Sequence, residues 1–197
     1  MSEHGEIQIT CGSDDEASAI GHRLVEQRLA ACVQSIPIGS VYDPFVLRGL
    51  DAFIYGVDND AKFVVAGTPA GVTLAPEGGA HQSTITASVG AELPNVTYSE
   101  PAYATEVDWL LCDALDQLSR PGGTSAYLRL STRPIDQAPF ASVLASLGEE
   151  RLREHVLLGG YRIIDGADDG RPAVTIVTGP TRSPSRRIRS GRASAGL

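Results

Sequence analysis

The chain has 197 residues, of which 42% are hydrophobic, and a formal net charge of −8. This length is sufficient for one domain with a substantial core or for two small domains. No apolar run approaches the ~20 residues that span a bilayer, and the acidic opening Met-Ser-Glu-His-Gly-Glu is unlike a signal peptide. We therefore expect a soluble, cytoplasmic protein with no membrane partner.

The charge is distributed unevenly along the chain. Residues 181–197 carry five arginines and no acidic residue, so the rest of the chain is more acidic than the total indicates. An acidic body disfavours nucleic acid as a specific partner. The Arg/Ser/Gly composition of residues 181–197, without any apolar period, predicts a basic disordered tail, and contact of this tail with RNA or acidic lipid is the alternative interpretation.

The three cysteines, Cys11, Cys32 and Cys112, are odd in number and far apart, and no Cys-x-x-Cys pair occurs. This spacing predicts reduced, structural thiols in a cytosolic protein. It favours neither a disulfide framework nor a zinc cage, so we expect no metal site from the cysteines.

The first part of the chain predicts a strand, a helix and a second strand. Apolar and polar residues alternate over 6–10, as in a short strand. Residues 12–14, Gly-Ser-Asp, supply a turn and an N-cap for an amphipathic helix that runs to about Leu29. Residues 31–33, Ala-Cys-Val, then open the next strand.

The segment DDEASAIGHRLVEQRLAACV resembles the N-terminal part of CutA, a family of small trimeric divalent-cation-tolerance proteins. The resemblance covers about residues 6–36 and implies a partial CutA-like β-α-β segment over 1–36. The later Trp-x-Gly turn and Lys-Thr strand end of that family do not appear. Cys32 matches a family cysteine, but one thiol is no copper site, so we interpret Cys32 as a small buried residue.

Strands and helices alternate from residue 37 to about 140, which predicts an α/β domain with a mainly parallel, doubly wound sheet. The predicted strands are 63–67, 96–98 and 126–131, and the predicted helices are 83–92 and one that begins at Pro101. Asp43-Pro44 predicts a cap and first position of another helix. The apolar residues of that helix are assigned to the core by their spacing: Phe45, Leu50, Phe53, Ile54 and Val57.

The remainder predicts smaller elements and a domain boundary. Residues 133–139 form a connector, 148–153 a short helix, and 156–157 with 160–164 a pair of hairpin-like strands. We assign 141–180 to a further connecting segment and to the start of a truncated further domain, whose first strand is 174–178.

A Gly-rich loop with two titratable residues follows the strand at 63–67. Glycines permit tight turns and the close approach of a ligand to the backbone. Glu77 and His81 are four residues apart, a spacing that binds metal on one helix face, but Gly78 and Gly79 argue against a helix. A histidine beside a carboxylate is suited to proton transfer at a carbonyl, and a surface histidine without function is the alternative.

The segment PEGGAHQS, followed by LPNVTYSEPAYATEV, resembles the pyrimidine-binding domain of thiamine-diphosphate enzymes. The families concerned are the homodimeric decarboxylating component of the pyruvate dehydrogenase complex and, more distantly, transketolase, and the resemblance covers about residues 36–177. It implies an incomplete transketolase-type fold, thiamine diphosphate with magnesium as cofactor, and a 2-oxo acid substrate. It also implies His81 as a proton shuttle, Glu77 as its partner, and Tyr42 or Phe45 against the aminopyrimidine ring.

Two parts of that family's site have no counterpart in this sequence. The carboxylate that activates the aminopyrimidine belongs to a region where this chain is CutA-like, and the Gly-Asp-Gly…Asn motif for magnesium diphosphate is absent from the 197 residues. We therefore expect a partial dehydrogenase- or transketolase-like protein, inactive alone, that forms a homo-oligomer or binds a complementing chain. The alternatives are a CutA-like copper-binding protein and a non-functional hybrid or truncated chain.

Overall fold

The computed structural model describes residues 13–28 and 38–164, and the chain divides into two compact units, 1–37 and 38–197. The predicted elements at 6–10, 31–33 and 174–178, and the predicted tail at 181–197, lie outside the described residues.

The first unit contains helix α1, Asp14–Glu26. The helix begins where predicted, because the Ser13 side chain accepts a hydrogen bond from the backbone N–H of Glu16 (3.2 Å) and so acts as its N-cap. It ends three residues before the predicted Leu29, and Arg28 adopts a left-handed conformation with φ of 57°.

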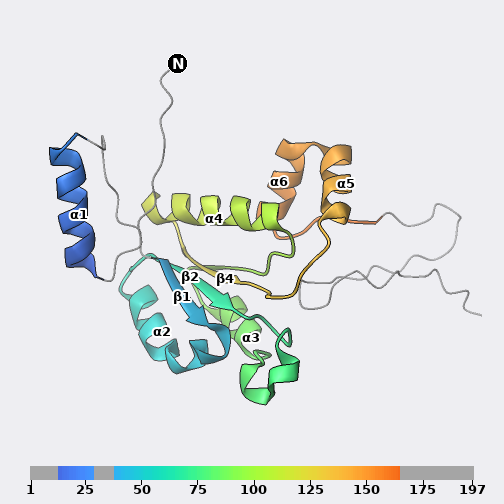
Figure 1. The fold of residues 1–197 in the computed structure, drawn as a ribbon, viewed down its shortest axis with the longest axis horizontal. Helices are drawn as coiled ribbons and strands as arrows, with labels where there is room; N and C mark the ends of the chain where they lie inside the picture. Colours follow the sequence, from blue (N-terminus) through green and yellow to red (C-terminus); the bar gives the residue numbers. More distant parts are fainter. Residues whose placement is uncertain (1–12, 29–37, 165–197) are drawn as a thin grey trace, which may run out of the picture. The chain divides into compact units, whose positions relative to one another are not determined.

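The second unit is built on a four-stranded parallel sheet in the order β1-β2-β4-β3 (Figure 1). Its strands are β1 (Ile38–Tyr42), β2 (Val64–Thr68), β3 (Val96–Ser99) and β4 (Ser125–Arg129). Every pairing is parallel, with Tyr42 opposite Thr68 and Gly67 opposite Arg129. The prediction of an α/β fold with a parallel sheet is confirmed.

Helices cover both faces of this sheet (Figure 1). Helices α2 (Leu50–Asp58) and α3 (Thr86–Glu92) lie on one face, and α4 (Ala104–Ser119) lies on the other. The central strand β4 is buried along its whole length. Because side chains alternate across a strand, its Tyr127 packs with Phe53 and Val57 on the α2 side, whereas its Ala126 and Leu128 pack with Ala114 of α4.

A third cluster joins α4 to the last two helices, α5 (Ala138–Leu147) and α6 (Glu149–Leu157). Phe140 of α5, Leu152 of α6 and Trp109 of α4 are all buried in it. Helix α5 was not predicted from the sequence, and the strands predicted at 156–157 and 160–164 are wrong. Val156 lies four residues after Leu152 on the buried face of α6, and residues 160–164 form no strand.

The segment after β1 also differs from the prediction. Residues Asp43–Arg48 form a 3₁₀ helix, η1, and α2 begins only at Leu50. Phe53 and Val57 are buried as expected, but Phe45 is 46% exposed and Ile54 is 39% exposed. The assignment of these two side chains to the core is therefore wrong. Phe45 lies in η1, outside the helical register of α2, and Ile54 of α2 follows directly after the buried Phe53 and lies off the buried face.

Helix α4 begins three residues after its predicted start at Pro101. The carboxylate of Glu106 accepts hydrogen bonds from the backbone N–H groups of Ala102 (2.6 Å) and Tyr103 (2.7 Å). These bonds satisfy donors that precede the first turn, so the chain enters the helix at Ala104 rather than at the proline.

One strand position requires the absence of a side chain. A Cβ added to Gly67 of β2 would collide with the carboxylate of Asp43 and the ring of Tyr127. Glycine at 67 therefore allows the buried side chains of Asp43 and Tyr127 to cross over the strand.

We predict that Gly67→Ala lowers the free energy of unfolding by about 1–3 kcal/mol, because overpacking displaces two buried side chains. Gly39→Ala in β1 is the matched control, since nothing lies within 4 Å of its added Cβ, and we expect a change within about 0.5 kcal/mol. Urea unfolding followed by the fluorescence of Trp109, the single tryptophan, measures both. Equal effects of the two substitutions would contradict the packing described.

Candidate functional site

Charged side chains from three strands meet at one edge of the sheet. Asp43 follows the last residue of β1, Arg129 is the last residue of β4, and Glu100 follows β3. The carboxyl ends of parallel strands lie at the same edge, which is where ligands bind in open α/β sheets. Asp43 is fully buried and Arg129 is 2% exposed.

The carboxylate of Asp43 accepts hydrogen bonds on both oxygens. Oδ1 accepts from the hydroxyl of Tyr127. Oδ2 accepts from the hydroxyls of Ser83 and Thr86 (2.8 Å for Thr86) and from Nε of Arg129 at 3.1 Å. A buried carboxylate is stable only with such complete satisfaction. Asp43 therefore joins β1, β4 and the segment that leads into α3.

The guanidinium of Arg129 uses each of its nitrogens for a different partner. Nε contacts Asp43, and one terminal nitrogen donates to Glu100 and to the Tyr98 hydroxyl (3.0 Å). The other terminal nitrogen donates to the backbone carbonyl of Ser83 at 2.7 Å. This planar fork fixes the ends of β3 and β4 and the Ser83 backbone relative to one another.

The tyrosines of this network remain uncharged donors. Burial, together with the hydrogen bond to Asp43, raises the pKa of Tyr127 above its ordinary value. Burial and the hydrogen bond to Glu100 raise the pKa of Tyr98 likewise. Burial acts against the charge of Arg129, but its hydrogen bond to Tyr98 and the charge of Glu100 outweigh this effect and raise its pKa. We refer to Asp43, Ser83, Thr86, Tyr98, Glu100, Tyr127 and Arg129 as the buried network.

The four residues singled out from the sequence lie together beside this network. A hydrogen bond of 2.5 Å joins the Tyr42 hydroxyl to Nδ1 of His81, and Glu77 lies 3.9 Å from the same nitrogen. The ring of Phe45 meets that of Tyr42 edge-on, with 5.2 Å between centroids. The side chains of His81 and Glu77 are 40% and 59% exposed. The group is therefore open to solvent or to a partner, and its role in binding or catalysis stays a prediction.

The backbone around Glu77 and His81 explains this grouping. Glu77 ends the 3₁₀ turn η2 (Ala75–Glu77), and His81 ends the next turn, η3 (Gly79–His81). Gly78 between them has φ of 110°, a conformation that other residues rarely adopt. The prediction that these two residues do not share an α-helical face is confirmed.

Sequence reasoning missed the roles of Asp43 and Arg129. Asp43 was expected to cap a helix, but its carboxylate makes no such bond and is buried in the network. For Arg129 the sequence pattern predicts only a place in the strand 126–131. A signal was present, because a charged residue in the run Ala-Tyr-Leu-Arg-Leu of a buried parallel strand requires a buried partner.

The described residues contain no group of three or more His, Cys, Asp and Glu side chains placed to hold a metal ion. Cys112 is a free, exposed thiol, and Cys11 and Cys32 lie outside the described residues. No helix in the described ranges is long and apolar enough to cross a membrane.

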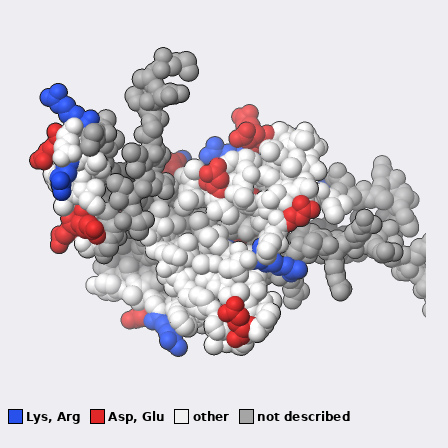
Figure 2. Space-filling model, viewed as in Figure 1, with Lys and Arg blue, Asp and Glu red and all other residues white. Residues whose placement is uncertain are grey.

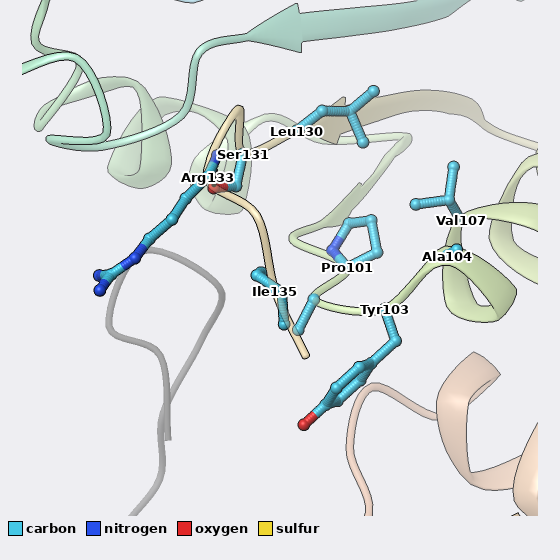
Figure 3. Close-up of a pocket in the computed structure, with 9 residues that line it drawn as sticks. Pro101, Tyr103, Ala104, Val107, Leu130, Ser131, Arg133 and Ile135 are labelled. Carbon is cyan, nitrogen blue, oxygen red and sulfur yellow. Dashed lines mark hydrogen bonds between the residues drawn. The ribbon is translucent and has the colours of Figure 1, made fainter. Parts of the chain in front are cut away.

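A separate cavity of about 240 Å³ lies between the start of α4 and the segment that follows β4 (Figure 3). Its lining is Pro101, Ala102, Tyr103, Ala104, Val107, Leu130, Ser131, Arg133 and Ile135. The side chain of Arg133 extends away from the other lining residues (Figure 3). None of the four sequence-predicted residues lines it.

Charged side chains of both signs are scattered over the face of the second unit seen in Figure 2. Lys and Arg form no continuous stripe among the described residues on that face. The expectation that nucleic acid is not a specific partner stays a prediction.

Comparison with known families gives one partial match. Residues 6–43 match the family described as CutA1 divalent ion tolerance protein. No curated protein matches the chain. The CutA resemblance of the first part is thus supported, and it extends through β1 to Asp43; neither comparison supports the resemblance to thiamine-diphosphate enzymes.

We predict that the free energy of unfolding falls as the pH rises above about 10. The unfolded chain loses its phenolic protons near that pH, whereas burial raises the pKa of Tyr127 in the folded chain, so the unfolded state binds fewer protons. Stability contributed by Tyr127 is complete below pH ~10 and declines by up to about 1.4 kcal/mol per pH unit above it. Urea unfolding between about pH 9 and 11 measures this slope.

Tyr127→Phe removes the phenol, so we expect a shallower alkaline slope in that variant, whatever its stability at neutral pH. A slope identical to that of the parent chain would show that Tyr127 ionises equally well in the folded and unfolded states.

Proposed function

We propose that residues 38–164 provide the pyrimidine- and substrate-facing side of a thiamine-diphosphate-dependent 2-oxo acid decarboxylase site. A second copy or a complementing chain with a diphosphate-binding domain completes the site, and the chain is inactive alone. The observation that carries this proposal is the meeting of Tyr42, Phe45, Glu77 and His81 at the carboxyl edge of the parallel sheet.

The side chains fit one half of such a cofactor. Phe45 keeps 46% of its surface exposed, although its ring contacts Tyr42 and the guanidinium of Arg48 lies 4.7 Å from its centroid. An exposed aromatic ring is a suitable contact for an aminopyrimidine. The Tyr42 hydroxyl is already bonded to His81, so of the two candidates Phe45 is the better ring contact.

The described residues do not fit the other half. They include no cluster of acidic side chains for a magnesium ion, and the sequence has no Gly-Asp-Gly motif. The magnesium diphosphate must therefore be held by another domain or chain, which is why we propose a partial site.

In this site the residues of the chain move and hold protons. Thiamine diphosphate supplies the carbanion chemistry when it is bound. His81 exchanges a proton with the substrate, and its exposed side chain gives access to a 2-oxo acid. Tyr42 fixes the ring of His81 through Nδ1, which leaves Nε2 for the substrate, and Glu77 lies 3.9 Å from Nδ1.

A second candidate function rests on the family match over residues 6–43. A CutA-like protein would be a trimer that binds a divalent cation such as copper. The described residues offer no metal cluster for it, and Cys32 lies outside them. A non-functional hybrid chain is the remaining alternative.

Calorimetric titration with thiamine diphosphate and magnesium tests the proposal. We expect the folded chain to bind, and Phe45→Ala to weaken binding by about tenfold, because one aromatic contact contributes about 1.4 kcal/mol. Ile54→Ala removes a similarly exposed apolar side chain from α2 and should leave binding unchanged.

A folded chain that releases no heat with thiamine diphosphate would contradict the proposal. Titration of the same sample with copper(II), with its oligomeric state measured by light scattering, then decides the alternative. Copper binding by a trimer favours the CutA-like function, and a monomer without either ligand favours the inactive hybrid.

A further inference from the structure

We propose that Arg129, Asp43 and Ser83 are positioning residues that hold Tyr42 and His81 in hydrogen-bonding geometry. The inference rests on the proposed function, in which His81 transfers protons. It concerns residues that lie beneath the exposed group and need not touch a substrate.

Each member of the pair is attached to the buried network by a near neighbour in the chain. Tyr42 is followed directly by Asp43, whose carboxylate is fully buried. His81 precedes Ser83 by two residues, and Ser83 is 3% exposed. The hydroxyl of Ser83 donates to Asp43, so one hydrogen bond connects the two chain segments that carry Tyr42 and His81.

Arg129 fixes the backbone of the His81 segment as well. Its terminal nitrogen donates to the carbonyl of Ser83 at 2.7 Å, while its Nε donates to Asp43 at 3.1 Å. The N–H of Ser83 in turn donates to the carbonyl of Gly71 at 2.8 Å. Both backbone polar groups of Ser83 are therefore held by residues distant in the sequence.

The bonds within the His81 segment itself are local. The N–H of His81 donates to Gly78 at 3.2 Å, and that of Gln82 donates to Gly79 at 3.2 Å. Such 3₁₀ turns next to glycines define the local path but not the position of His81 relative to Tyr42, which is 39 residues away. The buried network supplies that long-range constraint.

The network requires arginine at 129 in particular. Its three nitrogens point to Asp43, to Glu100 with Tyr98, and to the Ser83 carbonyl. A lysine retains the charge but has one ammonium group, which cannot reach these directions together. Arg129→Lys should therefore remove the hydrogen bond to the Ser83 carbonyl, while the lysine ammonium remains as a positive charge near Asp43.

The test is the ¹⁵N spectrum of the His81 ring in the full chain, assigned by the loss of its signals in His81→Ala. Tyr42→Phe removes the hydrogen bond to Nδ1 and defines the shift that its loss produces. We expect Arg129→Lys to shift the Nδ1 resonance in the same direction as Tyr42→Phe. Arg120→Lys is the matched control, because Arg120 pairs with Asp116 on the surface of α4, and it should leave the resonance unchanged.

Ser83→Ala serves where Arg129→Lys does not fold, because it keeps the Arg129–Asp43 pair and the Ser83 carbonyl and removes only the hydroxyl. It too should shift the Nδ1 resonance toward the Tyr42→Phe value. A folded Arg129→Lys or Ser83→Ala variant with the parent resonance would overturn the inference.

The spectrum needs no cofactor, so its outcome is separate from that of the calorimetric titration. If the variants show the Nδ1 shift but the chain binds no thiamine diphosphate, the positioning of His81 stands and the proposed function is wrong. If the chain binds the cofactor but the variants show no Nδ1 shift, the proposed function stands and the assignment of the positioning residues is wrong.

Discussion

The buried ion pair of Asp43 and Arg129 is the interaction on which the second unit depends. Removing one member of such a pair leaves an uncompensated charge and costs about 3–5 kcal/mol. By contrast, the Arg120–Asp116 pair on α4 is about half exposed on both sides and belongs to a class worth at most about 1 kcal/mol. The buried pair also ties together the ends of β1 and β4, which are not adjacent in the sheet.

The same pair connects the fold to the candidate site. Its partners Ser83, Thr86 and Tyr127 are buried and Tyr98 and Glu100 are half-buried. The side chains of Tyr42, Phe45 and His81 are partly exposed. In the proposed function, the buried partners restrict the positions of the exposed groups that would transfer protons. This is the physical link between the stability of the sheet and the geometry of the site.

Periodic patterns were sufficient to predict three strands of the sheet and most helices, but not the strand β1, Ile38–Tyr42. Short apolar runs bounded by turn residues predicted the three strands at 64–68, 96–99 and 125–129. Apolar residues three and four apart predicted helix α4. Helix α5 was missed, and the strands predicted after residue 155 were wrong, because short apolar runs there fit either type.

The site was predictable only in part. A local pattern, the Gly-rich loop, singled out Glu77 and His81, whereas Tyr42 and Phe45 were singled out only by a resemblance. The pairing of Asp43 with Arg129 joins residues 86 apart, and such a contact exists only once the strand order is known. A charged residue inside a buried strand indicates that a partner exists but does not identify it.

The most direct test of this account is a double-mutant cycle between Asp43 and Arg129. Asp43→Asn, Arg129→Met and the double variant are unfolded in urea beside the same cycle for Asp116 and Arg120. We expect a coupling free energy of about 2–3 kcal/mol for the buried pair and less than about 1 kcal/mol for the exposed pair. Equal coupling in the two cycles would contradict the central role of the buried ion pair.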